Sequence, residues 1–235
     1  MKIKLITGAT SYEAAINTIR QIEPFDLETK NLVVVPDSFS MQAESLIFDV
    51  LKIKSTLNIE VVGISRLASK ILRNQNIPFQ RISGLEEIFN IYKAVKECED
   101  KFVYFNKCGV DFCLKILQII KQFKACKIKP SQIKKVGDDL LDRKMQDLRI
   151  IYECYENLLG EKLDLSKLLE FFVENTEKCI DLSKTRLFFV NFDSFSMEIN
   201  SFICKLAGSV KDVQIGFARP ISIGNAFIYE DDILK

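Results

Sequence analysis

Residues 31–72 of the chain read NLVVVPDSFSMQAESLIFDVLKIKSTLNIEVVGISRLASKIL, and this stretch decides the fold. Two short, unbroken apolar runs, 32–35 and 59–62, each precede a loop and then a helix with one apolar face. Continuous apolar strands that alternate with amphipathic helices are typical of a parallel sheet covered on both faces. The sequence therefore predicts an α/β fold in which a parallel sheet is flanked by helices.

The two predicted strands end in loops with an unusual composition, PDSFS at 36–40 and GISR at 63–66. In open parallel sheets, ligands bind outside the carboxyl ends of the strands. Both loops are polar although core elements bound them on each side. We therefore expect the functional surface at these two loops.

A first strand at 2–7 leads through a glycine-containing turn into a helix, as in a phosphate-binding loop. We expect Ser11 to be the N-cap of this helix. The motif GxxxxGK[ST], counted from Gly8, would place glycine, lysine and a hydroxyl where the chain has Glu13, Ala14 and Ala15. The Glu13 carboxylate would repel a triphosphate, so the loop is not expected to bind ATP.

The composition excludes several classes of protein. The 235 residues are 48% hydrophobic, which suffices for one large domain or one domain with an inserted subdomain. A net charge of +1 gives no global attraction to nucleic acid or membranes. No apolar run approaches the roughly 18 residues that span a bilayer, and the N-terminus lacks a long apolar signal region. A cytoplasmic location is expected.

Seven cysteines, an odd number without a CxxC pair, indicate free thiols that act as small core hydrophobes. Histidine is absent, which removes the commonest general base and metal ligand. Catalysis by Ser-His-Asp or Cys-His groups cannot be built from this chain alone. No catalytic, cofactor-binding or metal-binding residues are predicted.

The segment 83–175 is mostly helical in its pattern and opens with a capping box, Ser83 to Glu86. Four apolar stripes recur at intervals of three and four residues, and each is expected to face a core. The stripes are Leu85, Ile88, Phe89, Tyr92 and Val95; Phe112, Ile116, Ile119, Ile120 and Phe123; Leu148, Ile151, Tyr152, Tyr155 and Leu158; and Leu165, Leu168, Leu169, Phe172 and Val173.

Seven lysines and no acidic residue lie between Asp111 and Asp138. Such a helix face could contact phosphates by charge attraction, or it could be a solvated face. Sheet-like runs then return at 186–191 and 213–217, separated by a helix at 196–206. We therefore predict a split sheet domain, 1–82 and 183–235, interrupted by a helical subdomain at 83–182. The tail 219–235 resembles a linker or edge segment, as if the chain were cut from a longer one.

Three segments carry a resemblance to a known family. They are VPDSFSMQAE at 35–44, GISRLA at 63–68 and NFDSFS at 191–196, and the helix at 144–159 has a matching texture. In this order and spacing, the chain resembles the N-terminal region of AddB (RexB), the B subunit of the bacterial AddAB helicase–nuclease. The last segment matches in part, because Asn191, Ser196 and Ile199 stand where the family has glycine, threonine and glutamate.

The resemblance implies a superfamily 1 helicase-like fold with a P-loop-type core and a helical insertion. It also implies an AddA-type partner, contact with single-stranded DNA, and a role in processing double-strand breaks for recombinational repair. The helicase-like half of AddB is regarded as an inactivated motor that inspects the strand for the Chi signal. The residues of this chain also indicate an inactive motor. An active motor would have a pair of magnesium-binding carboxylates at the end of a later strand, where this chain has Asn191 and only one acid, Asp193. The family's nuclease domain and iron–sulfur cluster are not in this sequence.

The DNA-binding candidates carried over by position are Ser38, Ser40 and Arg66. Arg66 can pair with phosphate or a base edge, and the hydroxyls can donate to phosphate or bases. Alternatives are an ion pair for Arg66 and helix capping for the two serines. Ile64 and Ser69 stand where some members have aromatic residues, each worth about 1–3 kcal/mol per stacked base.

Three hypotheses follow. The chain is expected to be a non-catalytic module that contacts single-stranded DNA and scaffolds an AddAB-type enzyme. Alternatively, it is a protein-interaction module without DNA contact, or an active NTPase. No cofactor is expected in this chain, and no membrane association.

Overall fold

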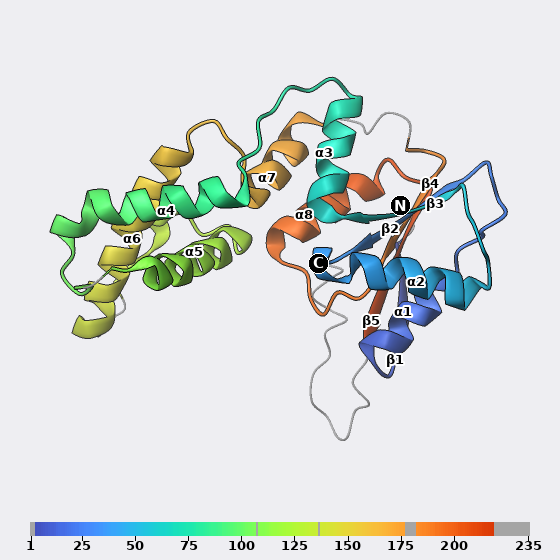
Figure 1. The fold of residues 1–235 in the computed structure, drawn as a ribbon, viewed down its shortest axis with the longest axis horizontal. Coiled ribbons are helices and arrows are strands. Elements are labelled where there is room, and N and C mark those ends of the chain that lie inside the picture. Colours follow the sequence, from blue (N-terminus) through green and yellow to red (C-terminus); the bar gives the residue numbers. More distant parts are fainter. Residues whose placement is uncertain (1–2, 107, 136, 177–181, 219–235) are drawn as a thin grey trace. The chain divides into compact units, whose positions relative to one another are not determined.

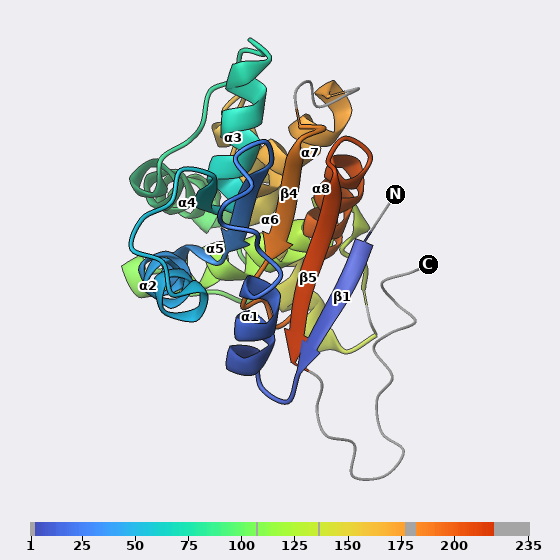
Figure 2. The same cartoon turned by 90° about the vertical axis from the view of Figure 1, so that its right-hand side faces the viewer.

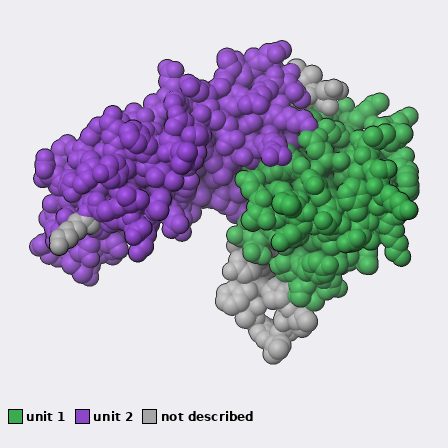
Figure 3. Space-filling model, viewed as in Figure 1, with its two compact units in different colours: residues 1–64, 181–194, 209–235 green, residues 65–180, 195–208 purple. Residues whose placement is uncertain are grey.

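The structure is a computed structural model that describes residues 3–106, 108–135, 137–176 and 182–218. The chain forms two compact units, coloured separately in Figure 3. Unit 1 comprises residues 1–64, 181–194 and 209–235, and unit 2 comprises 65–180 and 195–208. The predicted inserted subdomain at 83–182 stays a prediction, because grouping by contacts does not test where an insertion begins.

Unit 1 is built on a five-stranded, entirely parallel sheet in the order β1-β5-β4-β2-β3. Figure 1 shows how the elements are arranged, and Figure 2 shows β5 lying between β1 and β4. The five predicted strands and the α/β class are confirmed. The strands are β1 (Ile3–Gly8), β2 (Lys30–Val35), β3 (Ile59–Gly63), β4 (Thr185–Phe189) and β5 (Asp212–Ala218).

Two helices of unit 1, α1 (Ser11–Ile19) and α2 (Ser40–Leu51), pack on the same face of this sheet. A short 3-10 helix, η1 (Asp37–Phe39), precedes α2. The predicted inward residues Ala15, Ile19 and Ile22 of the first helical segment are all buried. They share a cluster with Leu46 and Ile47 of α2. The cluster also contains Val33 and Val35 of β2, Phe188 of β4 and Val190, the residue directly after β4.

Close packing of α1 requires glycine at two strand positions. A Cβ on Gly8 would lie 2.3 Å from Ala14 N and 2.7 Å from Glu13 C, which are backbone atoms of α1. A Cβ on Gly216 of β5 would lie 2.4 Å from Thr18 Oγ1 and 3.2 Å from Ala14 O. Gly8 therefore serves helix packing and needs no bound phosphate to explain it.

Unit 2 is helical, with local signals that set the ends of its helices. Its elements are α3 (Ile64–Asn74, whose first residue falls in unit 1), α4 (Gly84–Cys98), η2 (Glu99–Lys101), α5 (Val110–Ala125), η3 (Pro130–Gln132), α6 (Asp139–Leu159), α7 (Leu165–Asn175) and α8 (Met197–Ala207). The predicted capping box is confirmed: Ser83 Oγ accepts from Glu86 N at 3.2 Å, and Glu86 Oε2 accepts from Ser83 N at 2.9 Å. Gly160, with φ of 56°, ends α6 as expected.

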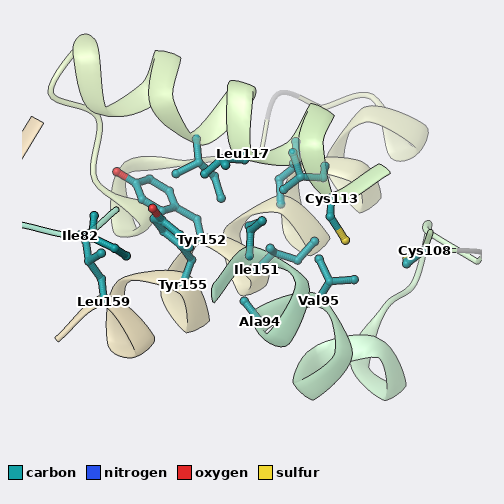
Figure 4. Packing of buried hydrophobic residues seen from close by; sticks show 14 residues of the cluster. Ile82, Ala94, Val95, Cys108, Cys113, Leu117, Ile151, Tyr152, Tyr155 and Leu159 are labelled. Carbon is teal, nitrogen blue, oxygen red and sulfur yellow. The ribbon is translucent and has the colours of Figure 1, made fainter. Parts of the chain in front are cut away.

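The core of unit 2 lies where α4, α5 and α6 meet. Figure 4 shows Ala94 and Val95 of α4 in the same cluster as Leu117 of α5 and Ile151 and Tyr155 of α6. The second and third apolar stripes are confirmed as core, with Phe112, Ile119, Phe123 and Leu158 packed at its margin. The fourth is confirmed for Leu168, Leu169 and Phe172, whereas Leu165 is 40% exposed.

The first stripe was predicted on the wrong face of α4. Leu85, Phe89 and Tyr92 are exposed and Ile88 is at the edge of exposure, so only Val95 is buried. The buried face is instead Ile91, Ala94, Val95 and Cys98. α4 is apolar on two sides, and the side with the small residue Ala94 lets α5 and α6 approach closely.

Six of the seven lysines in the run between Asp111 and Asp138 are exposed, as the solvated alternative expects, and Lys124 is the exception. Lys124 is buried and paired with Glu156 and Asp164, and Lys121 is paired with Glu87. Lys127 Nζ donates to Ser201 Oγ at 2.8 Å. Sequence alone could not reveal these partners, because Glu87, Glu156, Asp164 and Ser201 lie on other elements.

Six cysteines of the described ranges are free thiols. Cys98, Cys108 and Cys113 are buried in the core as predicted, whereas Cys126 and Cys204 are exposed and Cys154 is intermediate. The predictions about Cys179 and the tail 219–235 fall outside the described residues. Among the described residues, no helix is both long and apolar enough to cross a bilayer.

Candidate functional site

The parallel strands of unit 1 bring several loops to one edge of the sheet. Val35, the last residue of β2, pairs with Gly63, the last residue of β3. On the other side of β2, Val34 pairs with Phe189, the last residue of β4. The segments that follow these three strands therefore start side by side, at the carboxyl edge where the sequence predicts the functional surface; after β3 this segment is α3 itself, which begins at Ile64.

The loop after β2 presents Ser38 at the surface. The side chain of Ser38 is exposed, and it has no hydrogen bond within the described part of the chain. Ser40 is half-buried, and its hydroxyl donates to Asp37 O at 3.1 Å. The N-cap of α2 is Phe39, without a side-chain cap, so neither serine fulfils the capping alternative. Ser38 is thus the freer of the two predicted contacts.

Asp37 in this loop lies directly against the end of β3. A Cβ built on Gly63 would stand 1.9 Å from Asp37 Oδ1 and 3.2 Å from its Cγ. Glycine at position 63 is therefore required for the segment after β2 to lie against the end of β3. The predicted loop at 63–66 is wrong, because Gly63 ends β3 and α3 begins at Ile64. The sequence also gave no sign of the contact between Asp37 and Gly63.

Arg66, the third predicted residue, is in the first turn of α3 and belongs to unit 2. Its side chain is exposed, and among the described residues it makes no ion pair or hydrogen bond. The ion pair considered as an alternative for Arg66 is therefore not found there. Ile64 and Ser69 are 8% and 6% exposed, so neither offers a surface on which a base could stack.

The loop after β1 is closed by its own side chains. Thr10, not Ser11 as predicted, is the N-cap of α1, and its hydroxyl accepts from Glu13 N at 3.1 Å. Glu13 Oε2 in turn accepts from Ala9 N at 2.9 Å. The carboxylate thus takes a backbone donor that a phosphate-binding loop would offer to its ligand. Ala14 and Ala15, at the lysine and hydroxyl positions of the motif, are buried.

Asp193, the lone acid noted in the sequence, lies in the loop after β4. Its Oδ1 accepts from Ser11 Oγ at 3.2 Å, a contact between residues 182 positions apart. Asn191 has φ of 62°, a left-handed conformation that glycine adopts most readily and asparagine next. Within the described ranges, no three His, Cys, Asp or Glu side chains gather as ligands for a metal ion.

Comparison with known proteins settles the family. A family model described as "ADDB, N-terminal" matches residues 7–222, nearly the whole chain. The chain belongs to this AddB N-terminal family.

Several curated proteins, each named as the B subunit of an ATP-dependent helicase/deoxyribonuclease, are similar to this AddB-family chain. That of Clostridium botulinum (strain Loch Maree / Type A3) is 24% identical over 207 residues, covering 85% of the chain and 18% of the relative. That of Carboxydothermus hydrogenoformans is 24% identical over 188 residues, covering 76% and 17%. That of Alkaliphilus metalliredigens is 23% identical over 224 residues, covering 88% and 19%. The chain therefore spans less than a fifth of the length of these relatives.

Proposed function

We propose that the chain is a non-catalytic, helicase-like module of an AddB-type subunit. In this role it contacts single-stranded DNA and scaffolds a helicase–nuclease with an AddA-type partner, in cytoplasmic repair of double-strand breaks. Family membership and the name of the relatives support the assignment to such a subunit. The absence of catalysis and the contact with DNA rest on the residues of the site.

The hydrogen bond from Ala9 N to Glu13 Oε2 carries the proposal that the module does not hydrolyse ATP. A triphosphate at this loop would have to displace a carboxylate and then lie beside it, and like charges repel. The buried Ala14 and Ala15 supply neither a cation nor a hydroxyl for magnesium. A measurement of thermal stability with and without Mg-ATP tests this part, and stabilisation by ATP would favour the active NTPase.

DNA contact is supported by the exposure of Ser38 and Arg66 and by the absence of a charged partner for Arg66 in the described ranges. A free guanidinium can pair with a phosphate or with a base edge in forked geometry. The exposed carboxylates of Glu13, Asp37 and Asp193 would repel DNA phosphates near the loops of unit 1. Contacts from Ser38 are therefore expected to favour bases over the sugar–phosphate backbone.

Salt-dependent binding of a fluorescent single strand tests the DNA contact. The wild-type chain is compared with Arg66→Ala, and with Arg73→Ala as a control for the loss of one exposed arginine elsewhere on α3. We expect binding that weakens with salt, and weakens further in Arg66→Ala. Equal affinity of the assembled AddAB-type complex for DNA with and without Arg66→Ala would favour a protein-interaction module.

A further inference from the structure

The outward face of α4 is apolar. Leu85, Ile88, Phe89 and Tyr92 are 81%, 37%, 64% and 40% exposed, and we call these four residues the outer stripe. They stand at positions i, i+3, i+4 and i+7 and therefore share one side of the helix. The other side of α4 packs on α5 and α6. A helix that is apolar on both sides is normally enclosed on both sides.

We propose that the outer stripe docks into an apolar groove formed by the part of an AddB-type subunit that lies outside the N-terminal family segment. The spacing of the four residues is that of anchors in helix-in-groove recognition, where one helix face fills successive pockets. Phe89 is the central anchor, because aromatic side chains contribute most to such interfaces. This inference rests on family membership and goes beyond the DNA contact proposed above.

The charges beside the stripe are already paired within unit 2. Glu86 pairs with Lys162 at 2.7 Å and Glu87 with Lys121 at 2.6 Å. Further along α4, Lys93 pairs with Glu97 at 3.6 Å and Lys96 with Glu99 at 2.8 Å. Nucleic acid would require unpaired cations along the face, and an interfacial membrane helix would require free lysines or arginines at its flanks. An uncharged protein groove is the partner that fits.

The remainder of the subunit is the occupant because the relatives contain much more chain than this segment. The matched segment covers 17% to 19% of three of them, so most of such a subunit lies outside it. A contiguous apolar surface that stays open is unusual on a finished protein and marks an interface. The same docking is expected whether that part of the subunit is in the same polypeptide or in a separate one.

Site-specific photo-crosslinking in the assembled AddAB-type complex tests the docking. A benzoyl-phenylalanine replaces Phe89, and a control probe replaces Gln118, an exposed polar residue of α5. We expect crosslinks from position 89 to peptides of the AddB-type subunit outside residues 1–235, at least tenfold more abundant than from position 118. Crosslinks from position 89 to AddA, to DNA or to a second copy of residues 1–235, or none above the control, would overturn the proposal.

A double variant separates docking from folding. Leu85→Gln with Phe89→Gln removes two exposed side chains and keeps residues that support a helix. We expect the isolated chain to keep its circular dichroism and its Tm within about 2 °C, because the outer stripe is not part of the core of unit 2. In the complex, the benzoyl-phenylalanine probe is placed at position 88, with and without the double variant. The double variant should lose the crosslinks to the remainder of the subunit. Retained crosslinks would show that the stripe is not the docking surface.

Discussion

Lys124 Nζ lies 2.5 Å from Asp164 Oδ2, and both side chains are about 95% buried. Asp164 has a second task, because its Oδ1 accepts from Lys167 N at 2.9 Å and so caps α7. Glu156 completes the arrangement by pairing with Lys124 at 2.6 Å and with Lys167 at 3.1 Å. One carboxylate thus neutralises a buried cation and fixes the start of a helix.

The two tasks of Asp164 can be separated by substitution. Asp164→Asn keeps an oxygen that can cap α7 but removes the charge that faces Lys124, whereas Asp164→Ala removes both. We expect Asp164→Asn to lower the free energy of unfolding by about 2 kcal/mol, since Glu156 still neutralises Lys124 in part. Asp164→Ala should cost about 1 kcal/mol more, the usual value of an N-cap. Urea unfolding measures both; equal losses would show that the cap contributes nothing.

Glu198 makes stability depend on pH. Its side chain is 8% exposed, Oε2 has no hydrogen-bond partner among the described residues, and burial raises its pKa above the usual value of 4.5. Between 4.5 and the raised pKa, the folded state binds a proton that the unfolded state does not, so stability falls as pH rises through this window. Glu198→Gln stays neutral and should raise Tm at pH 8 but not at pH 4.

The matched control for that prediction is Glu170→Gln, on the exposed part of α7. Both glutamates line the same groove of about 650 Å³ in unit 2, but only Glu198 is buried. Tm is followed from pH 4 to pH 8 for both variants. A gain at pH 8 that is the same for both would attribute the effect to overall charge and not to the burial of Glu198.

Gly8 tests the packing of α1. Gly8→Ala would place a Cβ against backbone atoms of Ala14 and Glu13, which cannot rotate away. We expect it to destabilise the chain by about 2–3 kcal/mol, the cost of overpacking. Gly84→Ala is the control, because nothing lies within 4 Å of the added Cβ at the start of α4. It should leave Tm unchanged or slightly raised. A similar Tm for both variants would mean that α1 can shift away from position 8 at little cost in stability.

The sheet could be predicted from sequence because its strands are unbroken apolar runs with helices between them. Val33, Val34 and Val35 are completely buried, because both faces of the sheet are covered at this strand. The strand could therefore be predicted without deciding which of its faces is buried. The outer stripe of α4 could not be assigned, because Leu85 and Phe89 have the same periodicity as Ile91 and Val95. Periodicity shows that a face is apolar, and it does not show which of two apolar faces the neighbouring helices cover.

The candidate site was predictable in its position and not in its contacts. The parallel order of the strands places Gly63, at the end of β3, and the segment of Ser38 at one edge, which composition and spacing can indicate. The contact of Asp37 with Gly63 and the hydrogen bond from Ser11 to Asp193 join residues distant in sequence. Glu13 at a glycine position of the phosphate-loop motif could be noted from the sequence, but the hydrogen bond from Ala9 N to its carboxylate could not.

Asp147 holds the loop that follows α4 and η2. Its carboxylate is completely buried and accepts from the amides of Val103, Tyr104 and Phe105 at 2.8 to 3.1 Å. Asp147→Asn keeps the shape but turns one acceptor into a donor that faces these amides. We expect a loss of about 2–4 kcal/mol, because hydrogen bonds to a buried charged group are strong and an unsatisfied donor is costly.

Hydrogen exchange locates the effect of Asp147→Asn, and a surface carboxylate provides the comparison. Exchange should rise at the amides of 103–105, in the loop between η2 and α5, before α6 opens, because these donors lose their acceptor. Asp139→Asn removes an exposed i,i+4 pair with Arg143 at 2.7 Å and should change stability by at most about 0.5 kcal/mol. If both variants lose the same stability, the prediction is wrong. The loop would then be held by the packing of Phe102 and Phe105 on the core, and water could replace the carboxylate as the acceptor for the three amides.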